Sequence, residues 1–163
     1  MKLPSSIKRF IKRSPKVAVI RLHGIIGSAG RLNPGLSDHS LAPVIERAFA
    51  SKPKAIALSL NSPSAPPVQS SLIYTRIRSL AEEKGLPVYA CAEDVAASGG
   101  YMIACAADEI YADESSILGS IGVVSAGFGF TGLIEKLGVE RRVHTAGESK
   151  AMLDPFQPEK PEE

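Results

Sequence analysis

The sequence predicts an α/β protein built on a largely parallel sheet with crossover helices. Short runs rich in Val, Ile, Leu and Ala alternate with longer runs whose apolar residues recur at helical spacing. This alternation requires crossover connections, which place neighbouring strands parallel. Glycine, proline and serine gather between the runs, as turns require. At 163 residues the chain fits one domain with a sizeable core.

The elements follow from these runs in order. The predicted strands cover residues 17–22, 55–60, 88–92, 109–112, 117–124 and 140–145. The predicted helices cover residues 38–50, 68–84, 100–106 and 131–137. Asp38 is expected to cap the first helix, and Gly85 and Gly138 to end the second and the last. The inward side chains expected on the first two helices are Leu41, Val44, Ile45, Ala48, Phe49, Leu72, Ile73, Ile77 and Leu80.

Composition and charge exclude several classes of function. Apolar residues make up 44% of the chain and charged residues 22%, as in an ordinary globular protein. No apolar run approaches the ~20 residues of a membrane-spanning helix. Beyond residue 16 the acidic residues outnumber the basic ones, so no nucleic-acid binding is expected. Cys91 and Cys105 have neither disulfide nor metal spacing and are expected to be buried thiols, and no metal or other cofactor is expected.

Residues 1–16 form a basic arm with no acidic residue. Its apolar residues Leu3, Ile7, Phe10 and Ile11 share one helical face, a pattern that suits an anionic membrane surface. A solvated terminus is the favoured interpretation, with peripheral membrane contact as the alternative. No apolar stretch follows the charges, so a secretory signal is not expected. We therefore expect a cytoplasmic protein, or one peripheral to the cytoplasmic membrane.

One serine and one lysine carry the functional interpretation. An apolar run leads into Ser98, and the glycines that follow it open a helix-like run, which presents a hydroxyl at a sharp turn beside free backbone N–H groups. A serine hydroxyl needs a base to become a nucleophile. Lys150, in a Gly-Glu-Ser-Lys loop, is the candidate base, since a dry environment lowers the pKa of lysine. The pair favours a serine–lysine hydrolase.

Several ordered segments resemble the signal peptide peptidase A family of serine peptidases, which shares the fold of Clp protease and crotonase. The segments are residues 19–26, 60–63, 71–74, 97–108, 119–123 and 147–150. The resemblance covers nearly everything from Val17 to Pro158, and the expected peptidase domain spans residues 17–154. Residues 155–163, rich in proline and glutamate, are expected to be a solvated tail or the start of a truncated C-terminal segment.

The resemblance implies the roles of the site residues. Ser98 is the expected nucleophile and Lys150 the general base. Backbone N–H groups of Gly99 and of the Ser64–Ala65 loop are expected to hold the oxyanion, and Ser120 to orient the lysine. Ser120 bonded only to its own backbone is an equally weighted alternative. The resemblance also implies peptide substrates, including remnants of signal sequences and other unfolded membrane-associated chains, and assembly into a homo-oligomeric ring.

Other interpretations of the same residues stay open. The family has two glycines where this chain has Ser64 and Ala65, which keeps a catalytically impaired peptide-binding scaffold as an alternative. A crotonase-like acyl-CoA enzyme would use cleft carboxylates, with Glu93 and Asp94 as candidates. A Ser-His-Asp triad would draw on His23, His39 or His144. We expect His144 to have a structural or surface role. His23 ends a strand near the expected cleft, and a substrate-lining role for it stays open as an alternative.

Overall fold

The computed structural model describes residues 15–27, 35–147 and 150–160. The chain forms two compact units, Met1–Gly122 and Val123–Glu163, and each is described by itself. The basic arm over residues 1–14 and the glycine-rich stretch over residues 28–34 lie outside the described residues. The predicted boundary of a peptidase domain over residues 17–154 stays a prediction.

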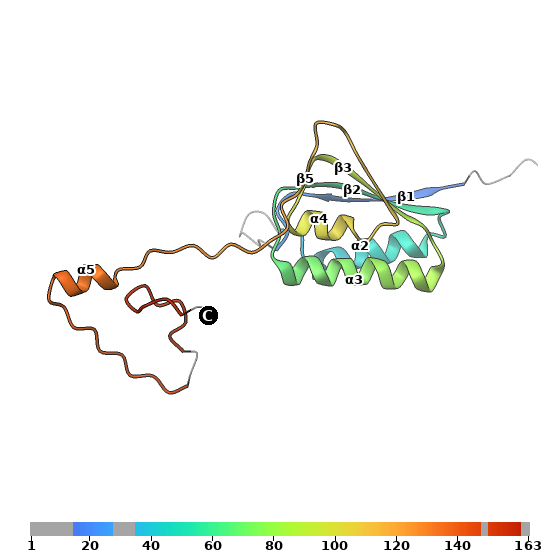
Figure 1. Cartoon of the computed structure of the whole chain (residues 1–163). Coiled ribbons are helices and arrows are strands. Elements are labelled where there is room, and N and C mark those ends of the chain that lie inside the picture. The colour runs from blue at the N-terminus through green and yellow to red at the C-terminus, as the bar shows by residue number, and fades with distance from the viewer. Residues whose placement is uncertain (1–14, 28–34, 148–149, 161–163) are drawn as a thin grey trace, which may run out of the picture. The chain divides into compact units, whose positions relative to one another are not determined.

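The first unit is built on a parallel sheet, as the sequence predicts (Figure 1). Its strands run in the order β1-β2-β3-β4, and β5 also pairs with β3. Every pairing is parallel. The register between β2 and β3 shifts after Leu60, so β3 carries extra residues shortly before Ser98. The strands are β1 (Val17–His23), β2 (Ala55–Ser62), β3 (Val88–Ala97), β4 (Glu109–Ala112) and β5 (Ile117–Gly119).

Three helices cover one face of this sheet (Figure 1). They are α2 (Asp38–Ala50), α3 (Pro67–Lys84) and α4 (Gly99–Ala104). One apolar core lies between the helices and the sheet. It is made of the inward-facing strand residues together with the buried side chains of each helix. Burying these side chains is the main driving force for this packing. The largest fully buried apolar side chains are Ile20, Leu22, Ile26, Ile45, Ile56, Leu58, Leu60, Ile73, Ile77, Val88 and Ile103.

Most predicted elements are confirmed, with corrections at the helix faces. Ser37, not Asp38, caps α2, and Asp38 is its first helical residue. Val44 and Leu72 are exposed, because the buried stripes of their helices run along neighbouring positions. Gly85 ends α3 in the left-handed conformation, as predicted.

Three further expectations are wrong. Cys91 and Cys105 are exposed, Cys91 on a sheet position that faces away from the helices and Cys105 just after α4. The strand predicted over residues 117–124 is confined to β5. In the described part of the chain, residues 140–145 form no strand, since their unit offers no strand to pair with.

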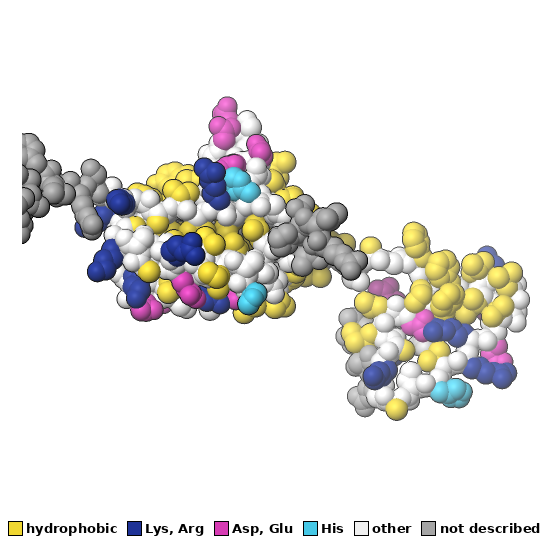
Figure 2. Space-filling model, turned by 180° about the vertical axis from the view of Figure 1, so that it is seen from behind, with side chains coloured by type: hydrophobic (Ala, Val, Ile, Leu, Met, Phe, Trp, Pro, Cys, Tyr) yellow, Lys and Arg dark blue, Asp and Glu magenta, His cyan; other side chains and the backbone are white. Residues whose placement is uncertain are grey.

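The second unit is small, and most of its described side chains are exposed. Its described residues hold one short helix, α5 (Thr131–Lys136), followed by Gly138 in the left-handed conformation. Hydrophobic side chains gather on its surface at the right of Figure 2, among them Val123, Val124 and Phe128. Across the described residues of both units, none of the helices combines the length and apolar character that crossing a membrane requires.

Candidate active site

Ser98 lies at the turn between β3 and α4 in a conformation that few non-glycine residues adopt. Its backbone angles are φ 54° and ψ −122°. Such a positive φ costs on the order of 1–3 kcal/mol and persists only where surrounding contacts enforce it. Here the Ser98 N–H donates to Gly119 O at 2.7 Å and Met102 N–H donates to Ser98 O at 3.0 Å, which fixes the turn from both sides. The Ser98 side chain makes no capping hydrogen bond with the described residues of α4.

Gly99 and Gly100 allow the loop after β2 to press against this turn. A Cβ on Gly99 would lie 2.0 Å from Ser70 Oγ and 2.3 Å from Ala65 Cβ. A Cβ on Gly100 would lie 2.9 Å from Ser62 O. No real Cβ approaches other atoms so closely, so both positions require glycine for close packing. The structure therefore brings Ala65 beside Gly99, at the edge of the sheet where β2 and β3 end.

The loop at Ser64 and Ala65 needs no glycine for its backbone. Neither residue is among the described positions with positive φ. Ala65 is buried against Gly99, and Ser64 is exposed. Ser64 O accepts a hydrogen bond from Ile26 N–H at 3.3 Å, which ties the loop to the segment after β1. The two substitutions relative to the family pattern are thus compatible with an ordinary loop conformation.

Ser120 lies next to Ser98 at the end of the neighbouring strand. Ala97 pairs with Gly119 in the parallel register, so Ser98 and Ser120 follow these partners directly. Ser120 is exposed and also has a positive φ, of 53°. Two adjacent serines in strained conformations at one sheet edge mark this place as one that the fold holds under constraint.

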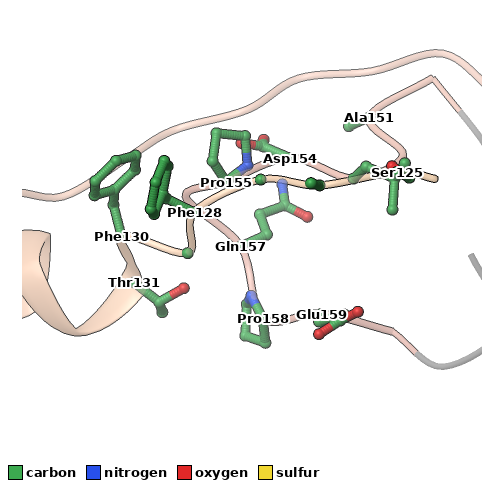
Figure 3. Close-up of a pocket in the computed structure, with 14 residues that line it drawn as sticks. Ser125, Phe128, Phe130, Thr131, Ala151, Asp154, Pro155, Gln157, Pro158 and Glu159 are labelled. Carbon is green, nitrogen blue, oxygen red and sulfur yellow. The ribbon is translucent and has the colours of Figure 1, made fainter.

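Lys150 belongs to the second unit, where it is exposed at the start of a turn. The segment after it returns to the start of α5, where Phe130 N–H donates to Pro155 O at 2.6 Å. A cavity of about 500 Å³ lies between this segment and the stretch before α5, lined by Phe128, Phe130 and Leu153 among others (Figure 3). The pairing of Lys150 with Ser98 stays a prediction.

Asp154 is the one strongly buried carboxylate of the second unit's described ion pairs, with a side chain 6% exposed. It pairs with Arg141, and its Oδ1 accepts the backbone N–H of Phe156 at 3.0 Å. The hydrogen bond from Arg141, reinforced by that from Phe156, lowers the pKa of the Asp154 carboxyl. Sequence reasoning missed this pair, because a lone arginine and a lone aspartate thirteen positions apart carry no local pattern.

His23 and the candidate carboxylates Glu93 and Asp94 bond to neighbouring strand residues, and His39 and His144 are exposed. His23 Nε2 lies 2.7 Å from Ser59 Oγ and 3.1 Å from Glu93 Oε1, and Ser59 Oγ donates to Glu93. Asn61 donates to Asp94 at 2.8 Å. Sequence reasoning also did not predict the polar cluster of His23, Ser59 and Glu93. Its signal in the sequence is a polar residue at alternating positions on each of the three strands. Among the described residues, no group of three or more His, Cys, Asp or Glu side chains is placed to hold a metal ion.

The parallel sheet, its covering helices and the turn at Ser98 define an α/β protein of the Clp protease and crotonase-like fold. Residues 81–163 match the model of peptidase family S49. The chain belongs to this peptidase family, as the sequence resemblance indicates. A mutant of a membrane-bound stomatin-specific protease shares the fold, with a TM-score of 0.52 at 20% identity over 71% of this chain and 51% of that one.

Two curated relatives are similar over almost the whole chain. A protein of Brucella melitensis biotype 1 named Na(+)/H(+) antiporter NhaA is 58% identical over 168 residues, 99% of this chain and 23% of that protein. The chloroplastic serine protease SPPA of Arabidopsis thaliana is 36% identical over 157 residues, 91% of this chain and 22% of that protein. The chain thus spans less than a quarter of either relative. Because residues 81–163 match the peptidase model, the stretch shared with the first relative is peptidase-like.

Proposed function

We propose that this chain carries the nucleophile and general base of a serine endopeptidase, Ser98 and Lys150. The observation that carries the proposal is the conformation of Ser98, at φ 54° and ψ −122° between a strand and a helix. A serine that served only as a helix cap would have extended backbone and would bond to the helix. Ser98 does neither, which supports a chemical role for its hydroxyl. Membership of peptidase family S49 supports peptide hydrolysis as that chemistry.

In the proposed reaction, the neutral amine of Lys150 takes the proton of Ser98 as Oγ attacks the peptide carbonyl carbon. The protonated lysine then gives that proton to the departing amine, leaving an acyl-enzyme. The same amine activates the water that releases the acyl group. The N–H groups of Gly99 and of the Ser64–Ala65 loop would stabilise the oxyanion, and loss of one such donor typically costs 10²–10³-fold in turnover. Ser120, beside Ser98 on the sheet edge, would orient the lysine amine.

The proposed substrates are peptides in extended form, among them signal-peptide remnants and other unfolded membrane-associated chains. The family match and the names of the relatives support this class. Assembly into a homo-oligomeric ring, and peripheral membrane contact through residues 1–16, belong to the same proposal. The chain covers only part of its relatives, so each of these properties concerns the whole protein in which it acts.

Labelling with a fluorophosphonate probe across pH 6–10 tests the dyad. The parent chain, Ser98→Ala and Lys150→Ala would be compared, with thermal unfolding measured in parallel. We expect labelling of the parent to rise with an apparent pKa well below the 10.4 of free lysine, and to vanish in both variants. A folded and assembled parent chain that does not label would contradict the proposal and favour an impaired peptide-binding scaffold.

A further inference from the structure

We propose that Arg141 and Asp154 are positioning residues that hold the turn carrying Lys150, an inference that rests on the proposed role of Lys150. Asp154 follows Lys150 by four positions, at the far end of a turn over residues 150–153. Whatever fixes Asp154 therefore fixes the C-terminal end of this turn within the second unit. A general base must be held within hydrogen-bond reach of the proton that it takes.

Asp154 is held through both of its carboxylate oxygens and through its backbone. Oδ2 pairs with Arg141 Nη1, and Oδ1 accepts from Phe156 N–H at 3.0 Å. Its carbonyl oxygen accepts from Gln157 N–H at 3.0 Å. The Asp154 side chain is only 6% exposed and the Arg141 side chain is 37% exposed, so the pair is partly shielded from solvent. Charge-assisted bonds of this kind fix geometry more strongly than neutral ones.

Aromatic contacts connect the Arg141–Asp154 pair to the start of α5. The guanidinium carbon of Arg141 lies 5.2 Å from the centroid of the Phe156 ring, within the range of a cation–π contact. The Phe156 and Phe130 rings have centroids 5.5 Å apart, and Phe130 N–H donates to Pro155 O. Figure 3 shows Phe130, Asp154 and Pro155 among the residues that line the cavity of this unit. Arg141, residues 154–156 and the start of α5 thus form one clasp.

The turn that ends at Asp154 contains a backbone conformation that its residue type disfavours. Leu153, directly before Asp154, has φ 55°, the left-handed region that favours glycine. A leucine keeps this conformation only where its surroundings enforce it. Without the Arg141–Asp154 pair, the turn would relax and Lys150 would lose its defined position.

Arg142 provides an internal comparison for Arg141. It also pairs with a carboxylate, Glu140, at 2.7 Å, but the two side chains are 74% and 70% exposed. An exposed pair of this kind contributes little and holds no other segment. Arg141 and Arg142 are adjacent in the chain and carry the same charge, so the main difference between them is how exposed their ion pairs are.

The test compares Arg141→Ala and Asp154→Asn with the matched controls Arg142→Ala and Glu140→Gln in the full chain. Amide hydrogen exchange over residues 150–157 reports on the turn without any requirement for activity. We expect faster exchange in the clasp variants and parent-like exchange in the controls. Phe156→Leu, which keeps an apolar side chain but removes the ring contacts, is expected to show an intermediate increase. Parent-like exchange in the clasp variants would overturn the inference.

Labelling with the fluorophosphonate probe then connects the turn to the chemistry. Loss of positioning is expected to lower the labelling rate on the order of 10²-fold and to shift the apparent pKa of its pH profile, while thermal unfolding of the first unit is unchanged. Arg141→Lys, which retains a cation beside Asp154, is expected to recover part of the rate. Parent-like labelling profiles in the clasp variants would reject the positioning role. A parent chain whose labelling does not depend on Lys150 would instead reject the proposed function.

Discussion

Ser37 and Ser98 are both serines directly before a helix, yet the chain folds around them in opposite ways. Ser37 is extended, with φ −125° and ψ 161°, and its Oγ accepts the N–H of Ser40 in a capping box. Ser98 has φ 54° and ψ −122°, and its backbone N–H is bound by Gly119 on a neighbouring strand. The Ser37 hydroxyl caps its helix, while the Ser98 hydroxyl, on a strained backbone, makes no cap hydrogen bond to the helix that follows it.

The difference teaches that the backbone, not the residue type or its place before a helix, decides what a serine does. At Ser37 the extended conformation is low in energy and the hydroxyl completes the helix end. At Ser98 the sheet and the glycine-packed loop enforce a conformation that prevents capping. Changes to either serine, or to the glycine that packs beside Ser98, should therefore have effects of different size and sign.

The largest effect is expected for Gly99→Ala. Its new Cβ would collide with Ala65 Cβ and Ser70 Oγ, so the loop at residues 62–65 must move. Overpacking of this kind costs about 1–3 kcal/mol of unfolding free energy, and we also expect fluorophosphonate labelling to fall, because the loop carries proposed oxyanion donors. Chemical denaturation and labelling measure the two effects.

Gly122→Ala is the matched control in the same unit, because its Cβ would meet no atom within 4 Å. We expect parent-like unfolding and labelling for this variant. Equal effects of Gly99→Ala and Gly122→Ala would show that close packing at the turn is not what constrains Ser98.

The next effect is a gain in stability where activity is lost. Ser98→Gly removes the strain of a positive φ, worth about 1–3 kcal/mol, at an entropic cost of about 0.5–1 kcal/mol. We expect a net stabilisation of about 1 kcal/mol in denaturant unfolding, together with complete loss of labelling. At Ser37, which is unstrained, glycine should instead cost a few tenths of a kcal/mol. Destabilisation at both positions would remove the energetic contrast between the two serines.

A smaller effect is expected for Ser37→Ala. The Ser40 N–H would lose its capping partner, at a cost of about 0.5–1 kcal/mol. Labelling of Ser98 should be unchanged, because the described side-chain hydrogen bonds of Ser37 join it only to Ser40 in α2 and not to the turn at Ser98. A labelling rate that falls in proportion to stability would mean that the two helix starts are coupled.

The sequence allowed the sheet, its order of elements and the sharp turn at Ser98 to be predicted, because these depend on apolar runs and glycine positions. It placed the cap of α2 one residue late, since Ser37 and Asp38 are both good capping residues and only backbone geometry separates them. The burial of Cys91 was misjudged because the helices cover only one face of the sheet, and Cys91 lies on the other face, where burial requires a second covering layer.

The parts that could not be predicted depend on long-range contacts. The Arg141–Asp154 pair joins residues in a region without regular structure, where no periodicity indicates a neighbour. The positive φ of Ser120 and of Leu153 likewise has no signal in the sequence, because neither serine nor leucine favours this backbone region. The pairing of Ser98 with Lys150 was expected only through the family resemblance.

The smallest effect concerns the first turn of α2 and its dependence on pH. Arg76 donates to both carboxylate oxygens of Asp38, which lowers the pKa of this carboxyl below its ordinary value of 3.8. A carboxyl with a lowered pKa in the folded state stabilises the protein above its unfolded pKa, and this contribution is lost as pH falls through the folded pKa. The pair is partly exposed, so the loss should be well below that at Gly99. We expect the parent chain to lose stability relative to Asp38→Asn as the pH is lowered below about 4, measured by denaturant unfolding between pH 3 and pH 7. A constant difference across this range would show that Asp38 contributes through packing at the helix start and not through its charge.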